Sequence, residues 1–409
     1  MGYVELHAHS AYSFLDGASL PEELAVRAAE LGYEALALTD HDGLYGSLEF
    51  AHMAKEFDVR AITGAEVTLR GGAHVTLLVE SPDGYANLCR LLTAAHRDTR
   101  PPGRETEPVP PALDQALLEE LHDGLVCLSG CARDGLAVHD PNAAARLSQA
   151  FGPDRFFVEL QRPYERGDVR RNAALRDLAE TLRVETVVTG DAHAHARSRV
   201  GLQDALVAIR NRTSLDGCER ERRGNHESIL LAPDEVHERF PDDRAAVERT
   251  VDLARRLEFD LTQELGYSYP DFSDRDEPAI KQLRALCDSL FLERYADANG
   301  HKRNARRRLD EELDLIERIG LAGFFLLHWE VLELAREVAR EVRGESVARQ
   351  VLPPGRGRGS SVGSIVCYLT GLSHVDPVAR ISRSAASSTT SSGRCRTSTS
   401  TFPATSASS

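Results

Sequence analysis

Short apolar segments alternate with amphipathic stretches through residues 1–200. Seven such segments are present: Tyr3–Leu6, Ala35–Leu38, Val59–Ile62, Val75–Val79, Leu125–Leu128, Phe156–Leu160 and Thr186–Thr189. Between them, Pro21–Leu31 and Leu48–Phe57 have helical periodicity, and Ser19 with Glu22 matches a helix-capping box. Strands that alternate with helices predict an α/β fold with a mainly parallel sheet. Seven such units predict a distorted (β/α)7 barrel or a similar closed sheet.

The pattern changes near residue 270, where we expect a domain boundary. Three longer helical segments follow: Ala279–Ala298, Arg308–Ile319 and Trp329–Val342. We therefore predict a first domain at 1–270 and a mainly helical second domain at 271–378. Residues 379–409 are mostly Ser, Thr, Ala and Arg, so they cannot form an apolar core, and we predict that this tail is disordered.

Composition narrows the class of protein. Apolar residues make up 42% of the chain and charged residues 28%, as in soluble globular proteins. The sequence shows no signal-peptide pattern, and no apolar run approaches the roughly 18 residues of a membrane span. Seven cysteines without a Cys-x-x-Cys pair argue against a disulfide framework. We expect a reduced, cytoplasmic protein without a membrane partner.

The charge distribution leaves one question open. A net charge of −15 is unfavourable for non-specific binding to nucleic acid. The segment His301–Arg308 is nonetheless strongly basic. It is either a local nucleic-acid-binding face or an ordinary solvated face of a helix.

Potential metal ligands gather at the strand ends. His7 and His9 are two residues apart, so on a strand they share one face. Six others lie at or just past the ends of apolar segments, and one, His74, opens a segment; together they are Asp16, His41, Glu66, His74, Cys131, Asp191 and His193. In a (β/α) barrel the strand ends converge on one face, so these side chains become neighbours.

These nine residues offer imidazole, carboxylate and thiolate groups. Such donors suit Zn²⁺, Mn²⁺ or Fe²⁺ better than Ca²⁺, which prefers oxygen alone. Nine ligands are too many for one ion and suit two or three ions that share carboxylates. Paired metals are typical of phosphoester hydrolysis, where they hold the phosphate and activate water. Four further histidines are interpreted as ordinary structural residues: His52, His96, His122 and His195.

The same positions resemble a known family. His7-x-His9, Asp16-Gly17, Thr39-Asp40-His41, Gly64-x-Glu66, His74, Cys131 and Asp191-x-His193 resemble the PHP (polymerase and histidinol phosphatase) domain. The resemblance implies that all nine bind metal and that the same nine residues carry catalysis. It also implies that the domain can act as a phosphoesterase or a 3′–5′ exonuclease.

The sequence segments around these motifs resemble one subgroup of the family. "SFLDGASLPEELAVRAAELGYEALALTDHDGLYG" resembles error-prone bacterial DNA polymerases, the second alpha-type group of the C family. "GRGSSVGSIVCYLTGLSHVDPV" resembles the start of their polymerase palm, and the likeness covers roughly residues 1–378. It implies that Gly357, Arg358, Gly359 and Ser360 bind the triphosphate of an incoming nucleotide. For the full-length relative it also implies Mg²⁺, a DNA primer-template, deoxynucleotides and other replisome or damage-tolerance proteins.

The chain departs from that family after the Gly-Ser loop. The family's acidic Pro-Asp-Ile-Asp-x-Asp motif is absent, and Arg394–Thr401 stands in its place. A shift of the reading frame by one base lets this segment read Pro-Asp-Ile-Asp-Leu-Asp. We therefore interpret residues 379–409 as a frame-shifted palm, with a genuine Ser/Thr-rich tail as the alternative. Sequencing the gene decides between them.

The function expected from the sequence is that of a truncated error-prone polymerase. Its PHP domain is complete, whereas its palm lacks the acidic motif, so we expect no polymerisation by these 409 residues. Two alternatives stay open: a free-standing PHP phosphatase for a small phosphate ester, and a non-catalytic, metal-stabilised scaffold. Residues 308–378 argue against the first, because such a phosphatase has no use for a palm-like segment.

Overall fold

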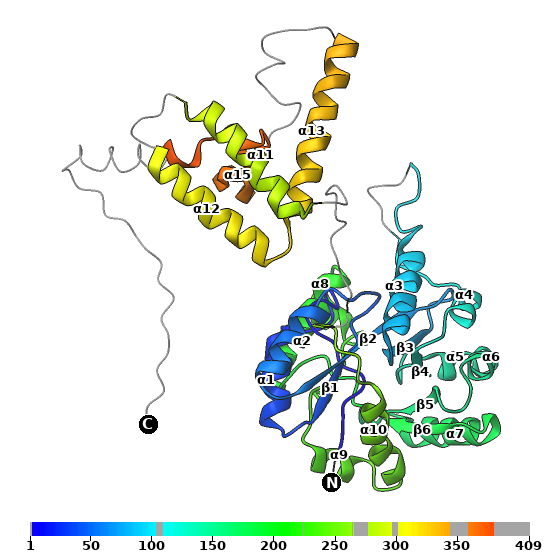
Figure 1. Ribbon diagram of the computed structural model, residues 1–409. Helices are drawn as coiled ribbons and strands as arrows, with labels where there is room; N and C mark the ends of the chain where they lie inside the picture. The colour runs from blue at the N-terminus through cyan, green and yellow to red at the C-terminus, as the bar shows by residue number, and fades with distance from the viewer. Residues whose placement is uncertain are drawn as a thin grey trace, which may run out of the picture. The chain divides into compact units, whose positions relative to one another are not determined.

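The computed structural model describes residues 2–103, 109–223, 225–263, 265, 277–296, 302–343 and 359–379 (Figure 1). The chain divides into two compact units, Met1–Gly266 and Tyr267–Ser409, close to the boundary expected near residue 270. The functions assigned to these two parts stay a prediction. Each unit is described by itself.

The first unit is built on a six-stranded curled sheet. Its strands follow one another in sequence order: β1 (Ala35–Leu38), β2 (Arg60–Thr68), β3 (His74–Val79), β4 (Leu125–Leu128), β5 (Phe156–Leu160) and β6 (Glu185–Val188). Three neighbouring pairs are parallel, but β3 runs antiparallel to both β2 and β4. Only residues 69–73 connect β2 to β3, and so short a connection makes a hairpin, because a parallel crossover needs a dozen residues or more.

The first predicted strand is an extended segment that makes isolated bridges on both sides. Glu5 bridges Leu36 of β1, and Ala8 bridges Ala192 just after β6, both in parallel. Ala37 N–H donates to the Glu5 carbonyl at 2.9 Å on one side, and His9 N–H donates to the Ala192 carbonyl at 2.8 Å on the other. This segment therefore joins the two edge strands. The predicted seven-unit barrel is realised as six strands plus this segment.

Helices lie around the outside of the sheet (Figure 1). They are α1 (Pro21–Glu30), α2 (Ser47–Glu56), α3 (Pro82–His96), α4 (Gln115–Glu120), α5 (Leu136–His139), α6 (Pro141–Phe151), α7 (Asp168–Leu182), α8 (Val200–Arg210), α9 (Pro233–Arg239) and α10 (Arg244–Arg256), with short 3-10 turns at Arg197–Arg199 and Asp216–Cys218. The capping box expected from Ser19 and Glu22 is wrong by one residue. Helix α1 begins after Leu20, whose N–H donates to Glu23 at 2.9 Å, while Ser19 contacts His195.

Both faces of the sheet are buried. Ala35 and Ala37 of β1 pack with Leu253 of α10 and with Leu257, the residue that follows this helix. The alternate β1 residues, Leu36 and Leu38, pack in a separate core beneath the outer helices. Since successive side chains of a strand point to opposite faces, an uninterrupted apolar strand requires cover on both sides. The strands of this sheet are covered on both faces, which explains why they appear in the sequence as continuous apolar runs.

The second unit is helical in its described part. It contains α11 (Ala279–Arg294), α12 (Lys302–Arg318), α13 (Ala322–Arg343), the 3-10 turn Gly359–Gly363 and α15 (Ile365–Leu369). Leu283, Leu309 and Ile365 are buried in its core. Helices α12 and α13 begin earlier than predicted, because residues of their first turns, such as Ala305 and Ala322, are buried in the same core.

The basic segment at 301–308 is largely the start of α12. Arg306 pairs with Asp288 at 2.5 Å and with Asp310 at 3.1 Å, and Arg308 donates to the Gly363 carbonyl at 2.6 Å. These pairings favour the ordinary helix-face interpretation over a dedicated nucleic-acid face.

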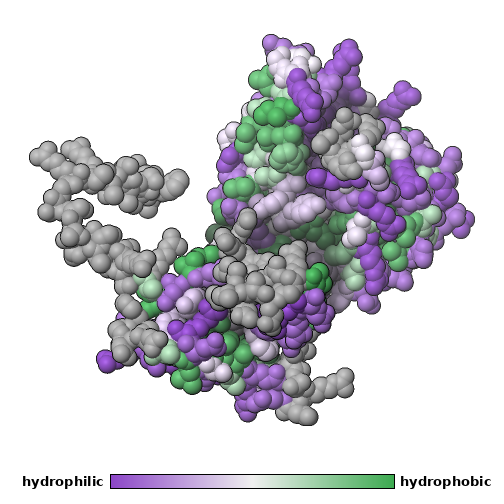
Figure 2. Space-filling view, turned by 90° about the horizontal axis from the view of Figure 1, so that it is seen from above, coloured by the Kyte–Doolittle hydropathy of each residue, from purple (hydrophilic) through white to green (hydrophobic). Residues whose placement is uncertain are grey.

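Two further predictions, the phosphate-binding loop and the C-terminal tail, fall partly beyond the described residues. Gly357, Arg358 and the tail from residue 380 lie outside them, while Gly359 and Ser360 begin a 3-10 turn. Among the described helices, none is both long and apolar enough to cross a bilayer. Hydrophilic side chains alternate with smaller apolar patches on the face seen in Figure 2, as on most folded proteins.

Candidate metal centre

The fold brings the predicted ligands to one edge of the curled sheet. His41 and Asp191 follow β1 and β6, whose carboxyl ends lie at this edge. His74 opens β3, but β3 is antiparallel, so its first residue lies at the same edge as the ends of the parallel strands. Glu66 lies inside β2, because that strand continues to Thr68 beyond the predicted end, and it bridges His41 directly.

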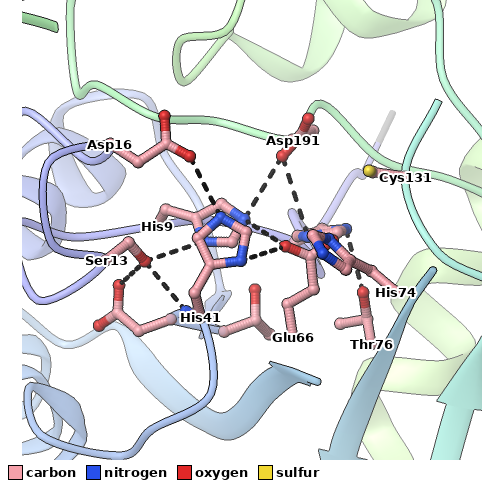
Figure 3. Close-up of polar contacts among 12 residues, drawn as sticks. His9, Ser13, Asp16, His41, Glu66, His74, Thr76, Cys131 and Asp191 are labelled. Carbon is pink, nitrogen blue, oxygen red and sulfur yellow. Dashed lines mark hydrogen bonds and ion pairs between the residues drawn. The ribbon is translucent and has the colours of Figure 1, made fainter. Parts of the chain in front are cut away.

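Glu66 is the centre of one group of side chains (Figure 3). One of its oxygens, Oε2, lies 2.8 Å from His41 Nδ1 and 3.6 Å from His9 Nε2. The other, Oε1, lies 3.3 Å from His74 Nδ1 and 3.6 Å from His7 Nε2. A single buried carboxylate thus faces four imidazoles, as expected of a bridging ligand.

Asp16 and Asp191 complete the opposite side of the cluster. Asp191 Oδ1 lies 3.4 Å from His9 Nε2 and 3.3 Å from His193 Nδ1. Asp16 Oδ2 lies 3.2 Å from His41 Nε2 and 3.3 Å from His193 Nε2. Eight of the nine predicted residues are therefore joined through contacts no longer than 3.6 Å.

Several atoms that point into this cluster have no hydrogen-bond partner among the described residues. They are His7 Nε2, His9 Nε2, Glu66 Oε1, His74 Nδ1 and Asp191 Oδ1, and all are buried. Leaving a buried polar atom unpaired costs about 1–3 kcal/mol, so five in one place call for a missing partner. Three sets of donor atoms each lie within 4.8 Å of one another: His9, His41 and His193; His7, His9 and Glu66; and His41, Glu66 and His74. The donors fit divalent metals of the nitrogen- and oxygen-binding kind.

The charges of the cluster are already those of a cation site. Burial alone would raise the pKa of Glu66, yet His41 and His74 outweigh it and hold that pKa well below the usual range. Burial lowers the pKa of His9, and the neighbouring His193 and His41 lower it further. Burial would also lower the pKa of His41, but Glu66 and Asp16 overcome it and raise that pKa to about 10. The ionised Glu66 carboxylate therefore faces one imidazole, His41, that holds a proton where no metal is bound, and another, His9, that stays neutral.

Cys131 is at the edge of the cluster and outside those three donor sets. Its sulfur accepts a hydrogen bond from Asp134 N–H at 3.3 Å. Burial raises the pKa of the thiol, and Glu66 and Asp191 raise it further. Its role as a ligand stays a prediction.

Residues that hydrogen-bond the ligand imidazoles from behind were not among the predicted site residues. Glu159 lies inside β5, and its Oε1 accepts from His7 Nδ1 at 2.7 Å and from Gln161 at 2.7 Å. Ser13 lies 3.0 Å from His9 Nδ1 and donates to Asp40 at 2.7 Å. Such contacts orient a ligating imidazole. The only sequence signal for Glu159 is one glutamate in the otherwise apolar segment FFVEL.

Arg223 was also not among the predicted site residues. It belongs to the charged stretch between α8 and α9, which gave no sign of its destination. Its guanidinium lies 2.7 Å from Asp191 Oδ2 and 2.5 Å from His193 Nε2. The cluster therefore contains a buried cation of the chain itself.

The histidines interpreted as structural lie in ordinary surroundings. His52 is exposed on α2. His96 Nε2 donates to the Asp42 carbonyl at 2.7 Å, and His122 Nδ1 donates to the Glu119 carbonyl at 2.9 Å. His195 pairs with Ser19 at 2.8 Å.

Comparison with known families agrees with this centre. Residues 5–163 match the family model of the PHP domain. Residues 281–384 match that of the bacterial DNA polymerase III alpha NTPase domain. The first unit thus carries a PHP domain. A solved structure described as a putative metal-dependent phosphoesterase from Bifidobacterium adolescentis has 16% identity and a TM-score of 0.35, covering 47% of this chain and 88% of that one.

Curated relatives make the assignment more specific. The chain is 38% identical over 400 residues to an error-prone DNA polymerase of Symbiobacterium thermophilum and 37% identical over 394 residues to that of Mycobacterium bovis. Each match covers 93% of this chain and 35% of the relative. The chain is an alpha-type relative of the error-prone DNA polymerases and spans about a third of the length of these relatives.

Proposed function

We propose that the first unit is a multi-metal phosphoesterase that acts on DNA as a 3′–5′ exonuclease. The observation that carries the proposal is the set of five buried, unpartnered donor atoms in the cluster of His7, His9, Glu66, His74 and Asp191. Those donors converge on one volume, as two or three shared metal ions require.

The nine predicted residues would hold the metals, which would supply charge to bind a phosphate and activate water. The roles of the protein residues follow from their positions. Glu66 faces four imidazoles and would bridge ions. Glu159 and Ser13 hold the His7 and His9 rings in place. Zn, Mn and Fe all suit this mixture of nitrogen and oxygen donors.

Exposed aromatic side chains favour a nucleotide chain over a small ester as substrate. Phe14 is 82% exposed and lies between Ser13 and Asp16, two residues whose side chains contact the cluster. Tyr45 is 66% exposed in the loop after His41. Aromatic faces stack on bases regardless of sequence, which suits a single-stranded DNA end.

The test compares variants of the 409-residue chain with Mn²⁺ and a 3′-labelled primer. We expect the wild type to release the labelled nucleotide and H9A to lose at least 100-fold in rate, because His9 belongs to two of the donor sets. H52A, which alters an exposed histidine of α2, is the matched control and should retain the wild-type rate. No release by any of the three would refute the exonuclease. Metal binding without release would favour the non-catalytic scaffold.

A second part of the proposal concerns synthesis. The printed sequence lacks the acidic Pro-Asp-Ile-Asp-x-Asp motif that its resemblance to a palm leads one to expect. We therefore propose that this chain does not extend primers, although its relatives are named DNA polymerases. Templated primer extension by the purified 409-residue chain would overturn this. We also propose that the chain acts on DNA in the cytoplasm. For the longer relative, we propose replisome partners and Mg²⁺.

A further inference from the structure

Two arginines of the second unit converge on Gly371, just after α15. A Cβ atom added to Gly371 would lie 2.6 Å from Nη2 of Arg336 and 3.7 Å from Nη2 of Arg294. Both terminal nitrogens therefore lie beside one small volume, although Arg294 ends α11 and Arg336 lies within α13. Gly371 has a φ of +84°, a left-handed conformation that glycine adopts readily, and its missing side chain makes room for both guanidinium groups.

The two positive charges are only partly balanced. Arg336 pairs with Glu333 through Nη1, whereas its Nε is buried and has no hydrogen-bond partner. Among the described residues, Glu333 is the one carboxylate that pairs with either guanidinium. The Asp376 carboxylate is engaged elsewhere, because it accepts from the Tyr295 hydroxyl at 2.9 Å and from Val378 N–H at 2.8 Å. Like charges brought together in this way repel each other, and an anion between them removes the repulsion.

The Tyr368 ring fixes the direction of the Arg294 side chain. Arg294 is exposed, yet its guanidinium carbon lies 4.9 Å from the centre of this ring, in a cation–π contact. Tyr368 is held in turn by the edge of the buried Tyr295, with the ring centres 6.0 Å apart. An arginine held on an aromatic face is preorganised to bind an acceptor, because less side-chain entropy is lost on binding.

We propose that Arg294 and Arg336 form a phosphate-binding site of the second unit and that its ligand is a backbone phosphate of DNA. Each planar guanidinium has paired N–H donors that match phosphate oxygens, so two of them beside one volume can hold a single phosphate. Such contacts fix a protein on DNA without reading its sequence. The choice of DNA rests on the proposed function, whereas the arginine pair belongs to a different unit from the candidate metal ligands.

The experiment measures the binding of the full 409-residue chain to a fluorescent single-stranded oligonucleotide by anisotropy. EDTA is present throughout, so that metal ions do not contribute. R294Q and R336Q each remove one of the two guanidinium groups. R284Q is their matched control, because Arg284 also lies on α11 but pairs with Asp314 at 2.6 Å and with Glu317 at 3.0 Å.

We expect R294Q and R336Q each to weaken DNA binding about 10-fold at low salt, as loss of a charge-assisted hydrogen bond does. The plot of log affinity against log salt concentration should become shallower by about 0.7, because one phosphate fewer is neutralised on a single strand. R294K should recover part of the affinity, since an ammonium binds phosphate as a point charge. R284Q should match the wild type.

A change of the opposite sign tests the same site from its acidic neighbour. E333Q removes the carboxylate charge that competes for Arg336, so it should bind the oligonucleotide roughly 3-fold more tightly, within the range of an exposed ion pair. E330Q changes the net charge equally at an exposed glutamate of the same helix and is the control. Equal affinities for E333Q and E330Q would contradict a role for the Glu333–Arg336 pair.

A phosphate can also come from a nucleotide, so dATP is titrated into the wild type and R294Q by calorimetry, again in EDTA. If R294Q loses dATP binding but keeps DNA binding, the assignment to DNA is refuted. If R294Q and R336Q bind the oligonucleotide as tightly as the wild type, or if the wild type does not bind it, the site itself is refuted. Circular dichroism of each variant separates these outcomes from misfolding.

Failure of this site and failure of the proposed exonuclease give different results. Release of nucleotide by the wild type with Mn²⁺, together with unchanged DNA binding by R294Q in EDTA, would refute the site and leave the exonuclease. Weakened DNA binding by R294Q, together with no release by the wild type, would refute the exonuclease and leave the site.

Discussion

Single residues of the centre depend on partners that lie far away in the sequence. His7 is held by Glu159, 152 positions later, through a 2.7 Å contact between Nδ1 and Oε1. Because Nδ1 is engaged, Nε2 is the nitrogen left to face Glu66. A carboxylate behind an imidazole fixes its tautomer and increases its strength as a ligand.

We therefore expect E159Q to weaken metal binding by roughly 10–100-fold, since the amide cannot stabilise the imidazole as a carboxylate does. E185Q is the control, because Glu185 is a strand residue that pairs with Arg249 at the surface. Mn²⁺ affinity by equilibrium dialysis provides the measurement. Equal affinities for E159Q and the wild type would show that His7 does not depend on Glu159.

At the scale of elements, the N-terminal extended segment is decisive. It closes the curled sheet and carries His7 and His9 to the edge where the parallel strands end. Its Glu5 is buried and accepts from Tyr3 and from Gly190 N–H, each at 2.8 Å. Burial raises the pKa of Glu5 to about 7, although these hydrogen bonds oppose the shift.

This raised pKa predicts a pH dependence of stability. Below the ordinary pKa of about 4.5 both folded and unfolded chains hold the Glu5 proton, so its contribution to folding is fully present. As the pH rises toward about 7, only the unfolded chain loses the proton easily, and roughly 3 kcal/mol of stability is lost. E5Q lacks this titration.

Urea denaturation of wild type and E5Q at pH 4.5 and 7.5, with chelator present, measures the difference. We expect the stability of E5Q relative to the wild type to increase by about 3 kcal/mol between the two pH values. Parallel pH profiles for the two proteins would contradict a raised pKa of Glu5.

At the scale of the whole molecule, the two units have separate cores. The residues packed around the sheet all belong to the first unit, and those packed among α11, α12 and α15 all belong to the second. The candidate metal ligands lie in the first unit alone.

Scanning calorimetry should therefore show two unfolding transitions. Mn²⁺ should raise the temperature of one transition only, because a ligand stabilises the unit that binds it, by about 2.7 kcal/mol at 100 times its Kd. H9A should abolish this shift. A single transition, or an equal shift of both, would contradict independent units.

The sequence by itself determined the alternation of strands and helices, because hydrophobic periodicity is a local property. It also placed seven of the eight clustered side chains, all but His74, at one edge, since parallel strands end there and side chains such as His41 and Asp191 come just after a strand. Only the tertiary structure decided the rest. The reversal of β3, the bridging of both edges by Glu5 and Ala8, and the arrival of Glu159 and Arg223 depend on contacts between distant segments. Such contacts are set by packing and electrostatics in three dimensions, which no local pattern of residues records.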